Sequence, residues 1–312
     1  MDSPLCRIKQ MSLTTISWVR NEADIIEIFV RHHAAFAERM IIIVHRSEDN
    51  TREILEELKR EGIPLDIRTD ERIAHEQGEA LSQLMLELAE EEPEAWILPL
   101  DADEFLGSMS SSPKELIHTL PHTPHLFPWR TYVPTPEDPM EELHVLRRIA
   151  HRRKNEIIPY SKVFFPASVG KTARLPLGSH QLLDRVTSEP IQMKDTEKLF
   201  LAHFPIRSEN QLRTKIIGGW LSHLANAKRK SGEIYQWENL FERAKDPRPI
   251  TQEELHVIAL RYALFPESLS PELIKDPLPT AATAMKYPVH MLDPGTLLSG
   301  RQNDRLKPAV VA

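Results

Sequence analysis

Three carboxylates follow an apolar run in the segment from Trp96 to Leu106. Asp101 and Asp103 are separated by a single alanine, and Glu104 comes directly after them. In an extended backbone, side chains two positions apart project to the same face, so Asp101 and Asp103 can converge. Carboxylate oxygens suit Mg²⁺ or Mn²⁺, which leave coordination positions for substrate phosphates. The segment predicts a divalent-metal site at the end of a buried strand; the alternative is a strand end followed by a solvated acidic turn.

Strand and helix patterns alternate ahead of this segment. Short apolar or β-rich runs predict strands at 13–19, 40–44, 64–69 and 96–100. Apolar residues at helical spacing predict helices between them, at 25–33, 54–61 and 75–92. Asn21 and Asp24, ahead of the first helix, are typical of a helix cap. This alternation predicts an α/β fold with a doubly wound, mainly parallel sheet flanked by helices.

Polar residues gather where the predicted strands end. In a parallel sheet the carboxyl ends meet at one edge, and ligands bind there near the point at which the strand order reverses. We therefore predict a nucleotide site built from the residues that follow the four strands: Arg20, Asn21, Glu22, His45, Arg46, Asp70, Arg72, Asp101 and Asp103. The chain has no Gly-x-Gly-x-x-Gly after the first strand and no Gly-Lys-Ser/Thr loop, which argues against a dinucleotide oxidoreductase or a P-loop enzyme.

The motifs at these strand ends resemble those of family-2 glycosyltransferases, which have the GT-A fold. The first strand is followed by Asn21-Glu22, the second by a Ser-x-Asp-x-Thr turn at 47–51, and the fourth by Asp-x-Asp-Glu-Phe at 101–105. The last motif is similar to the branch of the family that also resembles family-92 enzymes. Further similarity to this branch lies at 162–166, 178–180, 203–208, Lys215 and Gly218.

The resemblance implies a metal-dependent, inverting glycosyltransferase of polysaccharide biosynthesis. Its donor would be a nucleotide-diphosphate sugar, by default a UDP-sugar, and its acceptor a hydroxyl of a glycan or lipid-linked saccharide. Asp103 would ligate Mn²⁺ or Mg²⁺ at the diphosphate, and Asp101 would contact the ribose or a metal-bound water. Asn21 and Glu22 would lie near the base. His45 departs from the pattern, because such proteins usually have an aspartate there, and this leaves the nucleotide open.

Residues of the later part of the chain are expected to complete the donor site. In many enzymes of this fold a histidine from a C-terminal segment joins the metal shell, and here His203 or His180 could do so. A neutral imidazole fits Mn²⁺ better than Mg²⁺. Arg207 and Lys162 are candidates for binding the diphosphate oxygens.

Two features concern the acceptor. An inverting transfer needs a base near the acceptor hydroxyl. In the family that the chain resembles, this base is an acidic residue after the metal motif, and the matching stretch is the proline-dense 121–139, where Asp138 is the candidate. Trp220, Tyr235 or Trp237, in predicted helices, could stack on an acceptor sugar, or could simply pack against the sheet.

Length and composition fit an enzyme-sized protein. The chain has 312 residues, of which 41% are hydrophobic, and can bury a substantial core. We expect a GT-A-like catalytic domain at 12–207, a helical extension at 208–265 packed on it, and a proline-containing irregular tail at 266–312. Ser208 can cap the first helix of the extension.

Charge and segment analysis exclude some partners. The formal net charge of -7 argues against nonspecific binding to nucleic acid or anionic membranes. No apolar run has the length of a transmembrane segment, and the N-terminus lacks a signal-peptide pattern, so we expect a cytoplasmic protein. The single cysteine, Cys6, rules out an intrachain disulfide.

Two other functions compete with the glycosyltransferase. A metal-dependent phosphohydrolase also uses Asp-x-Asp at a strand end, but the haloacid-dehalogenase type has it on the first strand, not the fourth. A non-catalytic module that keeps the fold for binding is the second alternative. Titration with sugar nucleotides, with and without Mn²⁺, distinguishes the three.

Overall fold

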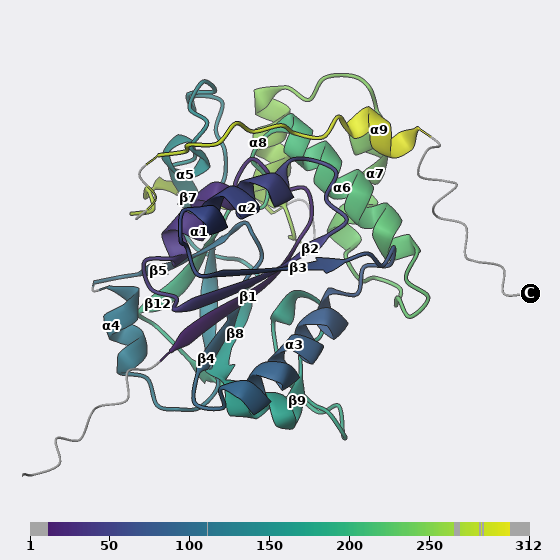
Figure 1. Ribbon diagram of the computed structural model, residues 1–312. Coiled ribbons are helices and arrows are strands. Elements are labelled where there is room, and N and C mark those ends of the chain that lie inside the picture. The colour runs from purple at the N-terminus through teal and green to yellow at the C-terminus, as the bar shows by residue number, and fades with distance from the viewer. Residues whose placement is uncertain (1–11, 111, 265–268, 281, 283, 300–312) are drawn as a thin grey trace, which may run out of the picture.

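A nine-stranded sheet lies at the centre of the computed structural model, which describes residues 12–110, 112–264, 269–280, 282 and 284–299 (Figure 1). Across the sheet the strands are β3 (Leu65–Asp70), β2 (Arg39–His45), β1 (Leu13–Val19), β4 (Trp96–Pro99), β8 (Ser161–Pro166), β6 (His125–Thr131), β12 (Leu199–His203) and β5 (Glu104–Ser108), while β11 (Lys194–Asp195) also pairs with β6. Helices flank the sheet on both faces. The predicted α/β fold is therefore confirmed, whereas Cys6 and the tail residues 300–312 lie outside the described residues.

The first half of the sheet, from β3 to β4, is parallel. Its helices are α1 (Ile26–His33), α2 (Thr51–Arg60) and α3 (Gln77–Glu91). Successive side chains of a strand point to opposite faces. In β2, Ile42 packs in the core that includes α1 and α2, whereas its neighbours Ile41 and Ile43 pack in the core that includes α3. Figure 1 shows α1 and α2 on one side of these strands and α3 on the other.

The second half of the sheet is mixed. β8 is antiparallel to both β4 and β6, β12 is parallel to β6, and β5 is antiparallel to β12. β4, β6 and β12 therefore run in the same direction as β1, and all four end at one edge, where β8 begins. The chain passes from β4 to β5 through Asp101 and Asp103 at this edge. His203, the last residue of β12, pairs with Glu104, the first of β5, and this brings His203 beside Asp103.

A helical layer follows β12. It contains α6 (Glu209–Leu224), α7 (Tyr235–Lys245) and α8 (Gln252–Arg261), which share a hydrophobic core. The Ser208 side chain accepts a hydrogen bond from the backbone N–H of Gln211, so the predicted cap of α6 is confirmed. No helix among the described residues combines the length and the apolar character that a membrane crossing requires.

The last described residues run back across the first half of the chain, over α1 and α2 (Figure 1). The Glu27 carboxylate of α1 accepts hydrogen bonds from the backbone N–H groups of Lys286 and Tyr287, at 2.9 and 3.0 Å. The remaining short elements are α4 (Pro113–His118), α5 (Val145–Arg148), β7 (His151–Arg153), η1 (Ala167–Lys171), β9 (Ala173–Arg174), η2 (Leu177–Ser179), β10 (Leu183–Asp184), β13 (Leu273–Lys275) and α9 (Pro294–Leu298).

One local prediction is wrong. Asn21 does not cap α1, because the N-cap residue of that helix is Ile25 and no side chain caps it. Asn21 instead adopts a left-handed conformation, at φ 54°, and its Oδ1 accepts a hydrogen bond of 2.7 Å from the backbone N–H of Glu48. Asn21 thus ties the loop after β1 to the loop after β2, which fixes two strand ends relative to each other.

Candidate active site

A cavity of about 370 Å³ opens at the edge where β1, β4 and β12 end. This volume lies within the range of about 300–1,000 Å³ that is typical of small-molecule sites. Of the predicted site residues, the cavity is lined by Arg20, Asn21, Glu22, Asp101, Asp103, His180 and His203. The others lie outside its lining: His45, Arg46, Asp70, Arg72, Asp138, Lys162 and Arg207.

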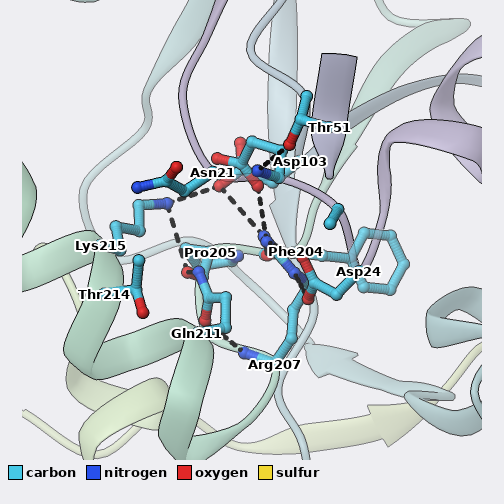
Figure 2. A network of polar contacts seen from close by, with 12 residues as sticks. Asn21, Asp24, Thr51, Asp103, Phe204, Pro205, Arg207, Gln211, Thr214 and Lys215 are labelled. Carbon is cyan, nitrogen blue, oxygen red and sulfur yellow. Dashed lines mark hydrogen bonds and ion pairs between the residues drawn. The ribbon is translucent and has the colours of Figure 1, made fainter. Parts of the chain in front are cut away.

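Asp103 is the centre of a buried polar network (Figure 2). Its Oδ2 accepts a hydrogen bond of 2.6 Å from Nζ of Lys215, an α6 residue whose ammonium also donates to the carbonyl of Pro205. Nη1 of Arg207 lies 3.8 Å from the same oxygen. Burial alone would raise the pKa of Asp103, but Lys215, together with His203 and Arg207, holds it well below the usual range. Asp103 is therefore a buried carboxylate that stays ionised.

Asp101 has both carboxylate oxygens engaged. Oδ2 accepts a hydrogen bond of 2.6 Å from Nζ of Lys162, and Oδ1 accepts one of 2.7 Å from the amide of Gln77. The same ammonium lies 3.0 Å from Oε2 of Glu104, which also accepts a hydrogen bond from the backbone N–H of Asp101. Burial, only partly offset by Lys162, raises the pKa of Glu104 to about 8. Lys162 therefore bonds both carboxyl groups, and its predicted role as a ligand of the diphosphate stays a prediction.

Arg207 is also committed within the protein. Its guanidinium is fully buried and donates to Glu22 at 2.6 Å and to both oxygens of Asp24 at 2.7 and 2.8 Å. Burial raises the pKa of Glu22 to about 7, and the positive charge of Arg207 limits this rise. The contact joins the segment after β12 to the segment after β1, and the predicted role of Arg207 at the diphosphate stays a prediction.

Trp18 organises the end of the cavity next to β2 and β3. His45 stacks on its ring at 4.0 Å between centroids, and the Trp18 Nε1–H donates to Oδ2 of Asp70 at 3.0 Å. Burial raises the pKa of Asp70, but hydrogen bonds from Arg72 and Trp18 outweigh it and lower the value to about 2. His45 and Asp70 therefore fix the position of Trp18, which lines the cavity.

Arg20 lies beside this end of the cavity. Its Nε is buried and has no hydrogen-bond partner among the described residues. Its Nη2 lies 3.9 Å from Oε1 of Glu48. A partly buried guanidinium in the cavity lining, with an unused donor, is suited to a ligand that accepts hydrogen bonds.

The two candidate histidines have different surroundings. Nε2 of His203 lies 3.8 Å from Oδ1 of Asp103. Nδ1 of His180 lies 2.8 Å from the carbonyl of Ser161; since a carbonyl only accepts, Nδ1 carries the proton and Nε2 is the basic nitrogen. Both rings contact Trp129, at centroid distances of 4.0 Å for His203 and 5.0 Å for His180. Burial lowers the pKa of His203 to about 3 and that of His180 to about 4, so both imidazoles are neutral at physiological pH.

Asp138, the predicted base, is not brought to the cavity. Its carboxylate accepts hydrogen bonds from the backbone N–H and the hydroxyl of Thr135, at 2.9 and 2.8 Å, and so closes a local turn. Trp220 does not line the cavity either; it stacks on His223.

Several lining residues were missed by the sequence analysis. They are Trp18, His75, Gln77, Trp129, Tyr160 and Tyr262. A sequence signal existed for Trp18, which stands one residue before the end of a strand that leads into the site. Trp129 lies in β6, a strand that the analysis did not predict.

We tested whether the residues present fit a divalent metal. Among the described residues, no three histidine, cysteine or carboxylate side chains are placed together to hold one. Asp103 and His203 form a pair whose facing atoms are 3.8 Å apart, less than the length of two metal–ligand bonds of about 2.1 Å each. The pair therefore fits an ion that takes its other ligands from phosphate and water. Asp101 does not fit as a direct ligand while Lys162 and Gln77 occupy its oxygens.

Comparisons with known proteins assign no family to the chain. No family model and no curated protein matches it. The structure of a mannosyltransferase from Pyrobaculum calidifontis in complex with GDP-Man and Mn²⁺ is similar over 80% of this chain and 74% of that chain, with 11% identity and a TM-score of 0.41. A Bacillus anthracis protein described as a glucose-1-phosphate thymidylyltransferase is similar over 51% and 74%, with 12% identity and a TM-score of 0.32. Likenesses this weak carry no functional argument, so the resemblance to family-2 glycosyltransferases stays a prediction.

Proposed function

We propose that this protein is a glycosyltransferase that moves a sugar from a nucleotide-diphosphate donor to a hydroxyl acceptor, with a divalent metal held by Asp103 and His203. The observation that carries the proposal is the position of the turn from Asp101 to Asp103. It projects carboxylates into a ligand-sized cavity whose lining also includes Trp18 and further aromatic rings. A nucleotide base would lie against Trp18, near Arg20, and the diphosphate at the turn.

The charges around this turn support metal dependence. Five carboxyl groups surround three fixed cations: Glu22, Asp24, Asp101, Asp103 and Glu104 against Lys162, Arg207 and Lys215. Because the pKa values of Glu104 and Glu22 are raised, these carboxyl groups and cations are close to balance. The cations are already bonded to the carboxyl groups, so the charge of a bare diphosphate at the turn would be left uncompensated. A divalent ion would offset this charge and stabilise the leaving diphosphate as a Lewis acid.

His180 is our choice for the base in place of Asp138. Its Nδ1–H is bonded to the Ser161 carbonyl, and its unprotonated Nε2 can accept the proton of an acceptor hydroxyl. It lines the cavity, whereas the Asp138 carboxylate is used in a turn outside it. Its tautomer is fixed by the backbone, which is the arrangement that a general base requires.

Calorimetric titration with UDP, GDP and their sugar conjugates, with Mn²⁺ and with excess chelator, tests the proposal. We expect one nucleotide family to bind at least about tenfold more tightly with Mn²⁺, a difference of about 1.4 kcal/mol. Asp195→Asn, at an exposed aspartate in β11, is the control and should bind like the wild type.

The products decide between the glycosyltransferase and its alternatives. Incubation with the bound nucleotide sugar should release nucleoside diphosphate and a transferred or free sugar. Release of inorganic phosphate instead would identify a phosphohydrolase. Tight binding with no turnover would identify a binding module, and equal affinity with and without metal would contradict metal dependence.

A further inference from the structure

In the described part of the chain, tryptophan and tyrosine, rather than phenylalanine, line the cavity. The chain has five tryptophans and five tyrosines, and six of these ten line the cavity. No phenylalanine among the described residues does so, although the chain has ten. Tryptophan and tyrosine combine an apolar ring with a hydrogen-bonding group. The cavity is therefore suited to ligands that present both apolar faces and hydroxyl or carbonyl groups, and not to an acyl chain.

These rings lie in two places. Trp18 stands at the nucleotide end. Trp129, Tyr160 and Tyr235 form a second group, the aromatic wall, in which Tyr160 lies against both Trp129 and Tyr235 and which borders His180 and His203. The Trp129 and Tyr160 rings are 5.3 Å apart between centroids, and the backbone N–H of Trp129 donates to the carbonyl of Tyr160. Burial and a hydrogen bond with Tyr160 raise the pKa of Tyr235 to about 12, so its hydroxyl stays protonated.

Trp237 also lines the cavity and is fixed in place. Its Nε1–H donates to the hydroxyl of Tyr262 at 3.0 Å, and its ring meets His75 edge-on at 5.5 Å. A Cβ atom on Gly219 of α6 would lie 2.6 Å from the Trp237 ring, so the ring packs directly on the helix backbone. The Trp237 ring is thus preorganised, and a ligand would bind beside it without first ordering this side chain.

The wall stands next to the reactive groups. Trp129 contacts both His203, which faces Asp103, and His180, whose Nε2 is unprotonated. The indole N–H of Trp129 is buried and has no partner among the described residues. A ligand bound on this wall could therefore place a hydroxyl near the unprotonated Nε2 of His180.

Resting on the proposed glycosyltransferase function, we propose that the wall formed by Trp129, Tyr160 and Tyr235 is the acceptor subsite and that the acceptor is a saccharide. A pyranose ring has an apolar face of C–H groups and an edge of hydroxyl groups, which matches rings that carry polar groups. A lipid tail would need an aliphatic or phenylalanine-lined surface, and the aliphatic side chains that line this cavity beyond alanine are Leu177 and Ile234.

Saturation-transfer NMR tests the subsite without turnover. The probes are methyl glucoside, methyl mannoside, cellobiose and maltose, each added to the full chain with nucleoside diphosphate and Mn²⁺ present. We expect at least one probe to bind, and Trp129→Ala and Tyr160→Ala to weaken it at least tenfold. Trp220→Ala, which removes a tryptophan outside the cavity, should leave it unchanged. Tyr160→Ala keeps the test decisive if Trp129→Ala fails to fold.

The outcomes separate the two proposals. Calorimetry should show unchanged nucleotide affinity in Tyr160→Ala, because the Tyr160 ring packs on Trp129 and His180 and not on Trp18. Saccharide binding without nucleotide binding in the wild type would support the subsite and contradict the donor. Nucleotide binding with no saccharide binding, or saccharide binding that Tyr160→Ala does not weaken, would overturn the subsite.

Discussion

The ammonium of Lys215 lies 2.6 Å from Oδ2 of Asp103, although the two residues are 112 positions apart in the chain. Lys215 comes from α6 and Asp103 from the turn between β4 and β5. Both side chains are largely buried, with exposures of 19% and 4%. The contact therefore joins the helical layer to the sheet at the proposed metal site. It also places a positive charge directly against the buried carboxylate of Asp103.

Replacement of this lysine should make the protein depend on metal for stability. Lys215→Met removes the charge and leaves the buried Asp103 without its main partner, which should cost about 3 kcal/mol of unfolding free energy. Mn²⁺ should restore more stability in the variant than in the wild type, because the ion would replace the missing charge. Thermal unfolding with and without Mn²⁺ measures both effects. An equal response of the two proteins to Mn²⁺ would show that the ion does not bind at Asp103.

The two histidines should separate metal binding from catalysis. His203→Ala should weaken Mn²⁺ binding at least about tenfold, because it removes one of two protein ligands. His180→Ala should keep Mn²⁺ and nucleotide affinity and lower transfer about 100-fold, as expected for loss of a general base. Mn²⁺ titration followed by electron paramagnetic resonance, together with turnover, distinguishes the variants. Loss of metal affinity in His180→Ala would assign the metal to His180 and contradict its role as the base.

Two adjacent glycines of α6 offer a matched pair of substitutions. A Cβ at Gly219 would lie 2.6 Å from the Trp237 ring, whereas one at Gly218 would have its nearest neighbour at 3.7 Å. Gly218→Ala should stabilise the helix by up to about 1 kcal/mol. Gly219→Ala should be destabilising by about 1 to 3 kcal/mol, because the overpacking exceeds that gain. Chemical denaturation measures both, and similar values for the two would show that Trp237 does not pack on Gly219.

Buried neutral histidines should make the protein sensitive to acid. Burial, partly offset by a hydrogen bond to the Leu106 carbonyl, lowers the pKa of His32 to about 4. A lowered folded pKa gives stability that is present above the unfolded value of about 6.5 and is lost as the pH falls towards 4. His32→Gln should lose less stability than the wild type over this range, by at most ~1.4 kcal/mol per pH unit.

Denaturation at pH 7, 6, 5 and 4 measures this slope. His118→Gln, at an exposed histidine that ends α4, is the control and should follow the wild type. Identical slopes for His32→Gln and the wild type would contradict the assignment.

The sequence predicted the parallel half of the sheet well, because its strands are continuous apolar runs separated by amphipathic helices. It did not predict β6, where Pro128 lies within a proline-dense stretch that is typical of a loop. Pro128 is tolerated because it pairs at the end of the ladder with Ser161, while the Phe127 ring packs on Phe164 inside the core. Burial of these rings overrides the local signal.

The site was predictable only where residues are close in the sequence. The turn from Asp101 to Asp103 is a local motif, and its place in the cavity follows from the strand before it. The partners of those carboxylates come from other elements, Lys162 from β8 and Lys215 from α6, and only the topology brings them together. Asp138 was chosen from its position along the chain, and its local turn with Thr135 shows why position alone was insufficient.

Turnover by Asp103→Asn tests the central claim most directly. The substitution keeps the size of the side chain and removes the charge that a metal requires. With the nucleotide sugar that the wild type binds and with saturating Mn²⁺, we measure release of nucleoside diphosphate by mass spectrometry. The variant should unfold cooperatively as the wild type does and release product at least about 100-fold more slowly. A folded variant with wild-type turnover would contradict a metal-assisted transfer at Asp103.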